Sequence, residues 1–124
     1  MVAEKSARRG ADPIPKFVIE VKRALAQTRQ INADLSRLAA VRRLRPDIRT
    51  FMFVISEAKR PKRFVNSNGH SISGTHHIPE SDGHYRVRRT CKAAHAFTKR
   101  DRAQYSCLIE VFPDPNKAKR RRTR

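Results

Sequence analysis

The sequence predicts an α+β domain in which an N-terminal helix or helix pair packs on a small, mostly antiparallel sheet, with basic N- and C-terminal extensions. Three observations predict this fold class. Apolar residues recur with helical spacing at residues 16–45, five large apolar residues follow one another at residues 51–55, and strand-like alternation recurs in the C-terminal half. Helices that precede a run of strands typically gather on one face of the sheet. We therefore expect arginine on the free sheet face and on the sheet edges.

Residues 16–45 carry the helical pattern, in which basic residues lie opposite an apolar stripe. The stripe consists of Phe17, Val18, Val21, Ala24, Leu25, Ile31, Leu35, Leu38 and Val41. Two interpretations stay open: one helix of about 30 residues, roughly 45 Å long, or two helices broken at residues 30–34 with Asn32 as an N-cap. We favour two segments, because Asn32 and Asp34 weaken the middle. Pro46 ends the helical part, since it disfavours the α conformation at Arg45.

Residues 48–56 are expected to form the central strand, because their apolar run is short, rich in β-favouring residues and typical of a strand covered on both faces. Residues 64–65 are expected to begin a short edge strand. Residues 85–88 and 105–112 alternate in the manner of half-buried strands. Between them, residues 66–84 are expected to form a long loop, which in so small a domain is either functional or ordered by a partner.

The chain divides into a flexible basic arm (residues 1–13), a single α+β domain (residues 14–113) and a basic tail (residues 114–124). No apolar run approaches the ~18 residues of a bilayer-spanning helix, and the first residues lack the apolar block of a secretion signal. Two cysteines make no disulfide framework and indicate a reducing compartment. We expect a cytoplasmic location on the ribosome, with an organelle or the nucleus as open alternatives.

Charge is the strongest functional signal in the sequence. The 29 basic residues exceed the 11 acidic ones and give a net charge of +18, which calls for a polyanionic partner. Arginine outnumbers lysine by 20 to 9. The planar, five-donor guanidinium suits phosphate and base stacking better than the point charge of lysine. The composition therefore predicts a nucleic-acid contact surface.

The basic residues occur in clusters, and acidic residues that could neutralise them are scarce. We expect the clusters to contact phosphates. Their members are Arg8, Arg9, Arg42, Arg43, Arg45, Lys59, Arg60, Lys62, Arg63, Arg86, Arg88, Arg89, Lys99, Arg100, Arg102, Lys119, Arg120, Arg121, Arg122 and Arg124.

Histidine and cysteine residues raise the question of a metal. The candidates are His70, His76, His77, His84, His95, Cys91 and Cys107. Their spacing is irregular, and no Cys-x-x-Cys pair occurs. We expect no metal site and no cofactor, and we interpret the histidines as polar loop residues that face phosphate or solvent. A disulfide between Cys91 and Cys107 stays open if their strands pair.

An enzyme hypothesis would combine His76, His77 or His84 with Glu80 or Asp82, as in a nuclease. Metal-dependent nucleases need carboxylates held close together. Glu80 and Asp82 are the one close acidic pair of this kind and have the character of a turn. We therefore expect that the protein is not an enzyme.

The alternative binding hypothesis is a helix-turn-helix in residues 16–45. Its second helix would carry Arg37, Arg42 and Arg43 into the major groove of DNA. The expected turn glycine is missing, which counts against it.

The sequence as a whole favours an RNA-binding structural protein of a ribosome or similar ribonucleoprotein, which contacts RNA phosphates through its arginine and lysine clusters and its tails. Its expected partners are RNA, in the first place ribosomal RNA, and neighbouring proteins of a large assembly, with no membrane. The alternative is a DNA-binding protein, either a helix-turn-helix-like regulator or a viral or chromatin packaging protein.

Overall fold

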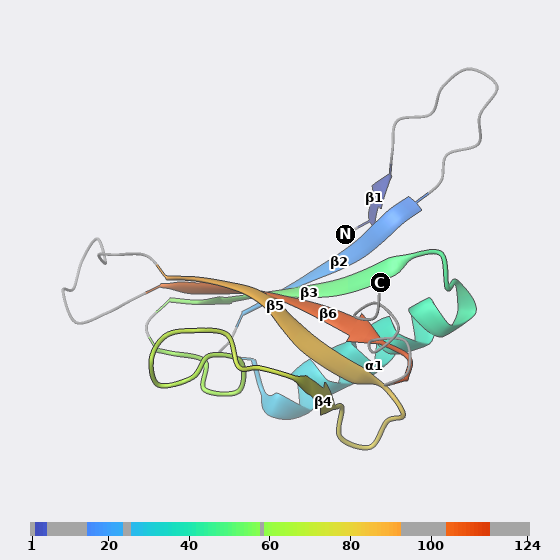
Figure 1. Cartoon of the computed structure of the whole chain (residues 1–124). Coiled ribbons are helices and arrows are strands. Elements are labelled where there is room, and N and C mark those ends of the chain that lie inside the picture. Colours follow the sequence, from blue (N-terminus) through green and yellow to red (C-terminus); the bar gives the residue numbers. More distant parts are fainter. Residues whose placement is uncertain (1, 5–14, 24–25, 58, 93–103, 115–124) are drawn as a thin grey trace.

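One mixed sheet and one helix make up the described part of the chain, which in this computed structural model comprises residues 2–4, 15–23, 26–57, 59–92 and 104–114. The elements are β1 (Val2–Glu4), β2 (Pro15–Arg23), α1 (Thr28–Leu44), β3 (Arg49–Ser56), β4 (Thr75–His77), β5 (His84–Lys92) and β6 (Tyr105–Phe112). The strands lie in the order β1-β2-β3-β6-β5-β4, with α1 against one face (Figure 1). Of the described pairs, β2 and β3 are parallel and the rest antiparallel, which confirms the α+β class.

The helical interpretation of residues 16–45 is wrong at its N-terminal end, where Pro15–Arg23 form β2. Phe17, Ile19 and Val21 alternate with the residues between them, so this segment satisfies the period of a strand as well as that of a helix. Tertiary pairing decides between the two periods, because β2 lies parallel to β3 from Phe17 to Arg23. The described residues therefore contain neither one long helix nor a helix pair.

Helix α1 is the crossover that a parallel pair of strands requires. It begins at Thr28 after Gln27, whose side chain makes no capping hydrogen bond. The helix is continuous through residues 30–34, so the break and the Asn32 N-cap expected there are wrong. The amide of Arg45 donates to the carbonyl of Val41 at its end, so the stop expected before Pro46 is confirmed.

The strand predictions in the C-terminal half are largely confirmed. β3 and β6 match the expected ranges, and β5 extends beyond residues 85–88 in both directions. Residues 64–65 form no edge strand, and only an isolated bridge joins Val65 to Ser71. The expected loop at residues 66–84 is interrupted by β4, whose three residues pair with the start of β5 and are too few to give a periodic signal.

The hydrophobic core lies on the helix side of the sheet. Leu35 and Leu38 of α1 pack against Met52 and Val54 of β3, and the segment between β3 and β5 contributes further side chains, among them Phe64. A Cβ on Gly83 would lie 2.7 Å from the Cβ of Ala39, so glycine lets this segment approach α1 closely. The larger part of the core therefore lies on the helix side, and Phe51 and Phe112 are buried in addition.

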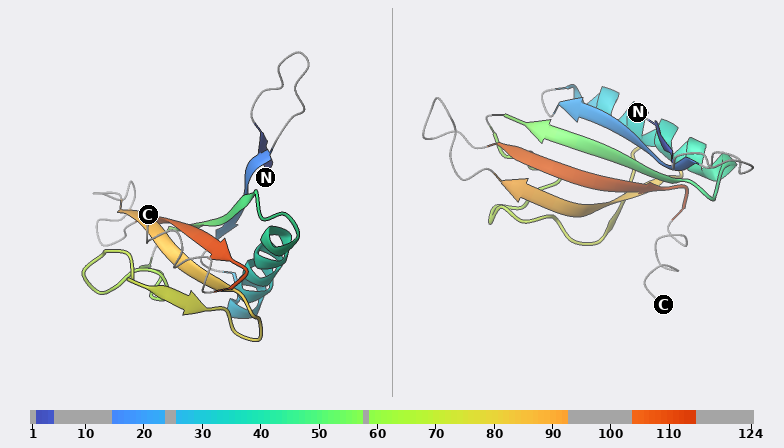
Figure 2. Two further views of the ribbon diagram at one scale, coloured as in Figure 1. Left: turned by 45° about the vertical axis from the view of Figure 1, so that its right-hand side comes forward. Right: turned by 90° about the horizontal axis from the view of Figure 1, so that it is seen from above.

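The opposite face of β3 is covered only in part. Phe51 on that face is buried like Met52 and Val54, whereas Phe53 and Ile55 are half-buried. In the right-hand view of Figure 2 the sheet lies in front of α1, and no described helix or strand lies on its near side. Among the described residues, no helix has the length and apolar character needed to cross a bilayer.

Several predictions fall outside the described residues. These are the greater part of the basic arm, the tip with Lys99, Arg100 and Arg102, residue His95, and the tail from residue 115 onward. The division into arm, domain and tail stays a prediction.

Candidate nucleic-acid interface

The sheet surface opposite α1 is the candidate interface, and we call it the free face. Cross-strand partners in register point to the same side of a sheet, and alternate residues of one strand share a side. By this rule the free face consists of Phe17, Ile19, Val21, Arg23, Arg49, Phe51, Phe53, Ile55, His84, Arg86, Arg88, Arg89, Cys91, Ser106, Leu108, Glu110 and Phe112. The face is mainly apolar over β2 and β3, with Arg23 and Arg49 at the strand ends, and cationic over β5. The expectation of arginine on the free sheet face therefore describes only part of it.

A β-bulge places two consecutive arginines on the free face. The register of β5 against β6 shifts between Val87 and Arg89. Arg89 lies opposite Leu108, while Nε of Arg88 donates to Oε1 of Glu110 at 2.8 Å. Leu108 and Glu110 are two residues apart on β6 and share a side. A bulge sets two residues against one and so re-aims a side chain, whereas strict alternation would have sent Arg89 to the helix side.

Three arginines from three elements converge on Glu110, and we call these four residues the Glu110 cluster. Nη1 of Arg42 on α1 donates to Oε2 at 3.0 Å. Arg49 on β3 donates from Nε to Oε2 at 3.0 Å and from Nη2 to Oε1 at 2.9 Å. Arg88 on β5 completes the set, and the carboxylate has no exposed surface. The guanidinium of Arg42 also lies 4.8 Å from the ring centroid of Phe112.

The electrostatics of the Glu110 cluster leave a surplus of positive charge. Burial by itself would raise the pKa of Glu110, but the hydrogen bonds from Arg49 and Arg88 and their charges outweigh burial and lower the pKa to about 2. Glu110 is therefore a carboxylate at neutral pH. One negative charge is shared by three guanidinium groups, so the cluster stays cationic where Arg49 and Arg88 reach the surface.

The arginines predicted near the end of α1 do not form one phosphate-binding surface. Arg42 is buried in the Glu110 cluster rather than exposed. Arg43 donates to the carbonyl of Pro113 at 2.7 Å, and Arg45 pairs with Asp47 at 3.3 Å. Arg42 is therefore not part of the candidate interface.

The cluster at residues 59–63 lies on the helix side of the sheet, away from the free face. Arg60 donates to the carbonyl of Val65 at 2.7 Å. Arg63 donates to the hydroxyl of Tyr85 at 3.3 Å, and its guanidinium lies 5.2 Å from that ring. Lys59 and Lys62 are exposed. This cluster thus forms a second cationic surface.

The assumption that arginines lack carboxylate partners is wrong for many described residues. Five carboxylates pair with seven cations, because Asp34 and Glu110 each serve more than one. The few acids thus lie where basic side chains crowd together.

Sequence reasoning missed Arg49, Phe17 and Phe53 as members of the candidate interface. A signal was present for β3, because Arg49 and Phe53 are four residues apart in an extended segment and so share a face. For Phe17 the helical interpretation hid the strand. The bulge that aligns Arg88 with Arg89 has no signal in the sequence.

Three histidines make ring contacts between β4 and β5. The rings of His77 and His84 are 5.1 Å apart, and His76 stacks on Tyr85 at 5.4 Å. No three His, Cys, Asp or Glu side chains within the described ranges are placed to hold a metal ion. Cys91 is exposed and Cys107 buried, and both are free thiols.

Acid should weaken the fold through His84. Burial, then the charge of His77, lowers the pKa of His84, while a hydrogen bond with the backbone of Asp82 and the charge of Asp114 act in the opposite direction. Since the unfolded chain then binds the proton more tightly, the free energy of unfolding should fall as pH drops below about 6.5. Urea unfolding between pH 8 and pH 5 should show this loss, and His84→Gln should reduce it. An identical pH dependence in both proteins would contradict the assignment.

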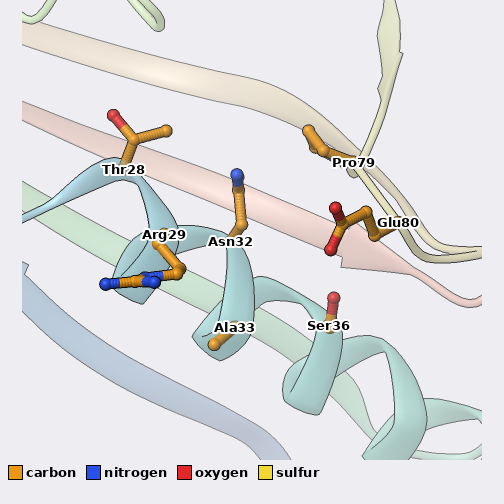
Figure 3. Close-up of a pocket in the computed structure, with 7 residues that line it drawn as sticks. All are labelled: Thr28, Arg29, Asn32, Ala33, Ser36, Pro79 and Glu80. Carbon is orange, nitrogen blue, oxygen red and sulfur yellow. The ribbon is translucent and has the colours of Figure 1, made fainter.

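A shallow pocket of about 500 Å³ lies between α1 and the turn after β4. Figure 3 shows its lining residues, which are Thr28, Arg29, Asn32, Ala33, Ser36, Pro79 and Glu80. Glu80 adopts a positive φ of 60°, and Oδ1 of Asn32 is buried without a partner. None of the histidines of the enzyme hypothesis lines this pocket, so Glu80 and those histidines are not brought together there.

Comparison with known proteins gives no family for this chain: family models, curated proteins and solved structures all returned no match.

Proposed function

We propose that this chain is an RNA-binding structural protein of a ribosome or similar ribonucleoprotein particle in the cytoplasm. The observation that carries the proposal is the charge of the free face. Among its described residues the one acid, Glu110, is fully buried beneath arginines, so the charge presented to solvent is positive. A cationic surface of this kind is complementary to a phosphate backbone.

The placement of these arginines supports the proposal. Arg49 and Arg88 are held by Glu110, and Arg89 is directed to the same face by the bulge. Guanidinium groups that are already ordered lose less side-chain entropy when they bind a phosphate. Lys59 and Lys62 on the other side of the sheet would let the protein contact a second RNA segment, as a structural protein of an assembly must.

The helix-turn-helix alternative loses its structural basis, because residues 15–23 form a strand and α1 is the one helix of the described chain. The other form of the alternative, a viral or chromatin packaging protein that binds DNA, is distinguished by the DNA duplex in the binding experiment.

The purified protein should bind RNA with a steep salt dependence. With about six phosphate contacts, affinity for a labelled RNA should fall about a hundredfold or more between about 50 and 200 mM salt. Arg89→Gln should reduce the slope of log K against log salt by about 0.7 to 0.9. Fluorescence anisotropy measures both, with a DNA duplex as competitor.

Arg45→Gln is the matched control, since it removes the same charge from a residue that pairs with Asp47 outside the free face. An equal loss in both variants would reject the free face as the contact surface. Absence of RNA binding at low salt, or preference for the DNA duplex, would contradict the proposed function.

A further inference from the structure

We propose that the free face binds single-stranded RNA, with bases stacked on its phenylalanines and a phosphate held between Arg49 and Arg88. This inference rests on the proposed function and deepens it, because RNA binding through phosphates alone would not require an unpaired strand. It follows from the way one sheet surface combines apolar and cationic halves.

The apolar half lies over β2 and β3. Phe17 and Phe53 are half-buried, and Val21 keeps 51% of its surface exposed. Figure 2 shows no described helix or strand over this side of β2 and β3. Aromatic rings on an open surface are the platform on which unpaired bases stack, whatever the sequence.

The cationic half begins beside this platform on the same strand. Arg49 lies at the start of β3, and its guanidinium is 5.1 Å from the ring centroid of Phe51. The ring of Phe51 in turn makes an edge contact with Phe17 at 6.2 Å. Arginine and aromatic side chains thus form one continuous surface from β2 to β5.

The geometry of the Glu110 cluster suits a phosphate. Nη2 of Arg49 lies 2.9 Å and Nε of Arg88 2.8 Å from the same oxygen, Oε1 of Glu110, so the two guanidiniums are side by side. Their side chains are 43% and 29% exposed. Each guanidinium has five N–H donors, and the bonds to Glu110 use two in Arg49 and one in Arg88. The remaining donors provide the paired, charge-assisted contact that a phosphate oxygen accepts.

Single-stranded RNA is the occupant that uses both halves. In a duplex the bases are paired and stacked inward, so only phosphates and sugars would meet the sheet and the phenylalanines would stay exposed to water. An unpaired strand presents bases and phosphates to one surface at once. A second copy of the chain fits less well, because the like charges of two free faces would oppose each other.

The test compares a labelled single-stranded oligouridine with an RNA duplex of equal length. Phe53→Leu keeps an apolar side chain but removes the aromatic ring, so single-strand affinity should fall at least about fivefold while duplex affinity changes less than twofold. Phe53→Tyr keeps an aromatic ring, so its single-strand affinity should match that of the unmodified protein. Leu44→Ala, which alters an exposed apolar residue off the free face, should change neither.

Circular dichroism checks that each variant is folded, and sedimentation measures its oligomeric state. Equal single-strand affinity in Phe53→Leu and the unmodified protein would overturn the inference and leave the proposed function standing. Preference for the duplex would also overturn the inference alone. So would a dimer of the unmodified protein that the Phe53→Leu substitution dissociates without loss of RNA binding. Failure of the unmodified protein to bind either RNA would overturn both.

Discussion

Replacing Glu110 by glutamine should lower the free energy of unfolding by about 3–5 kcal/mol. The variant keeps the shape of the side chain but removes the one negative charge among Arg42, Arg49 and Arg88. Arg42 is buried, and the variant would remove the carboxylate with which it pairs. Urea unfolding at pH 7 measures the loss.

Glu110 should also make the stability of the fold depend on pH in the acidic range. The pKa of Glu110 is lowered from 4.5 to about 2, so its contribution of about 3 kcal/mol is present above pH 4.5 and is lost as pH falls toward 2. The Glu110→Gln variant should not show this loss of unfolding free energy at low pH. Glu57→Gln is the matched control, because its pair with Arg23 is exposed and should contribute less than about 1 kcal/mol. Similar small losses in both variants would show that the cluster does not stabilise the fold.

Truncating Leu35 to alanine should cost about 2–5 kcal/mol. Leu35 is fully buried between α1 and the sheet, and its removal leaves a cavity in a core that α1 and the segment before β5 share. Leu44→Ala makes the same chemical change on the same helix at a position 80% exposed, so its effect should stay within about 0.5 kcal/mol. Denaturant midpoints of the two variants decide the matter, and equal midpoints would contradict the packing of α1.

The helix side of the sheet carries most of the core, and the free face carries the residues that we propose for RNA binding. Leu35, Met52 and Val54 belong to the core on the helix side, whereas Phe53, Arg88 and Arg89 lie on the free face. A strand alternates its side chains between faces, so one residue can serve the core while its neighbour serves a ligand. Glu110 joins the two roles, because it neutralises Arg42 from α1 and orders Arg49 and Arg88 at the surface.

Local patterns were sufficient for β3 and β6. A run of β-favouring apolar residues and a clear alternation identify their ranges, because both signals lie within the strand itself. The end of the helix before Pro46 was predictable for the same reason, whereas its start at Thr28 and its continuity through residues 30–34 were not. Net charge also belongs to the sequence, since it depends only on composition.

The tertiary structure decided what local patterns leave ambiguous. Residues 15–23 carry apolar side chains that fit either period, and pairing with β3 makes them a strand. The bulge beside Val87 and the convergence of three arginines on Glu110 depend on how strands align, and the residues involved are up to 68 positions apart. The sequence by itself determined that the chain is strongly cationic and where its central strands run. Only the folded sheet decided which arginines are buried in the core and which lie at the surface. The register of strand pairing and the position of α1 against the sheet set those contacts.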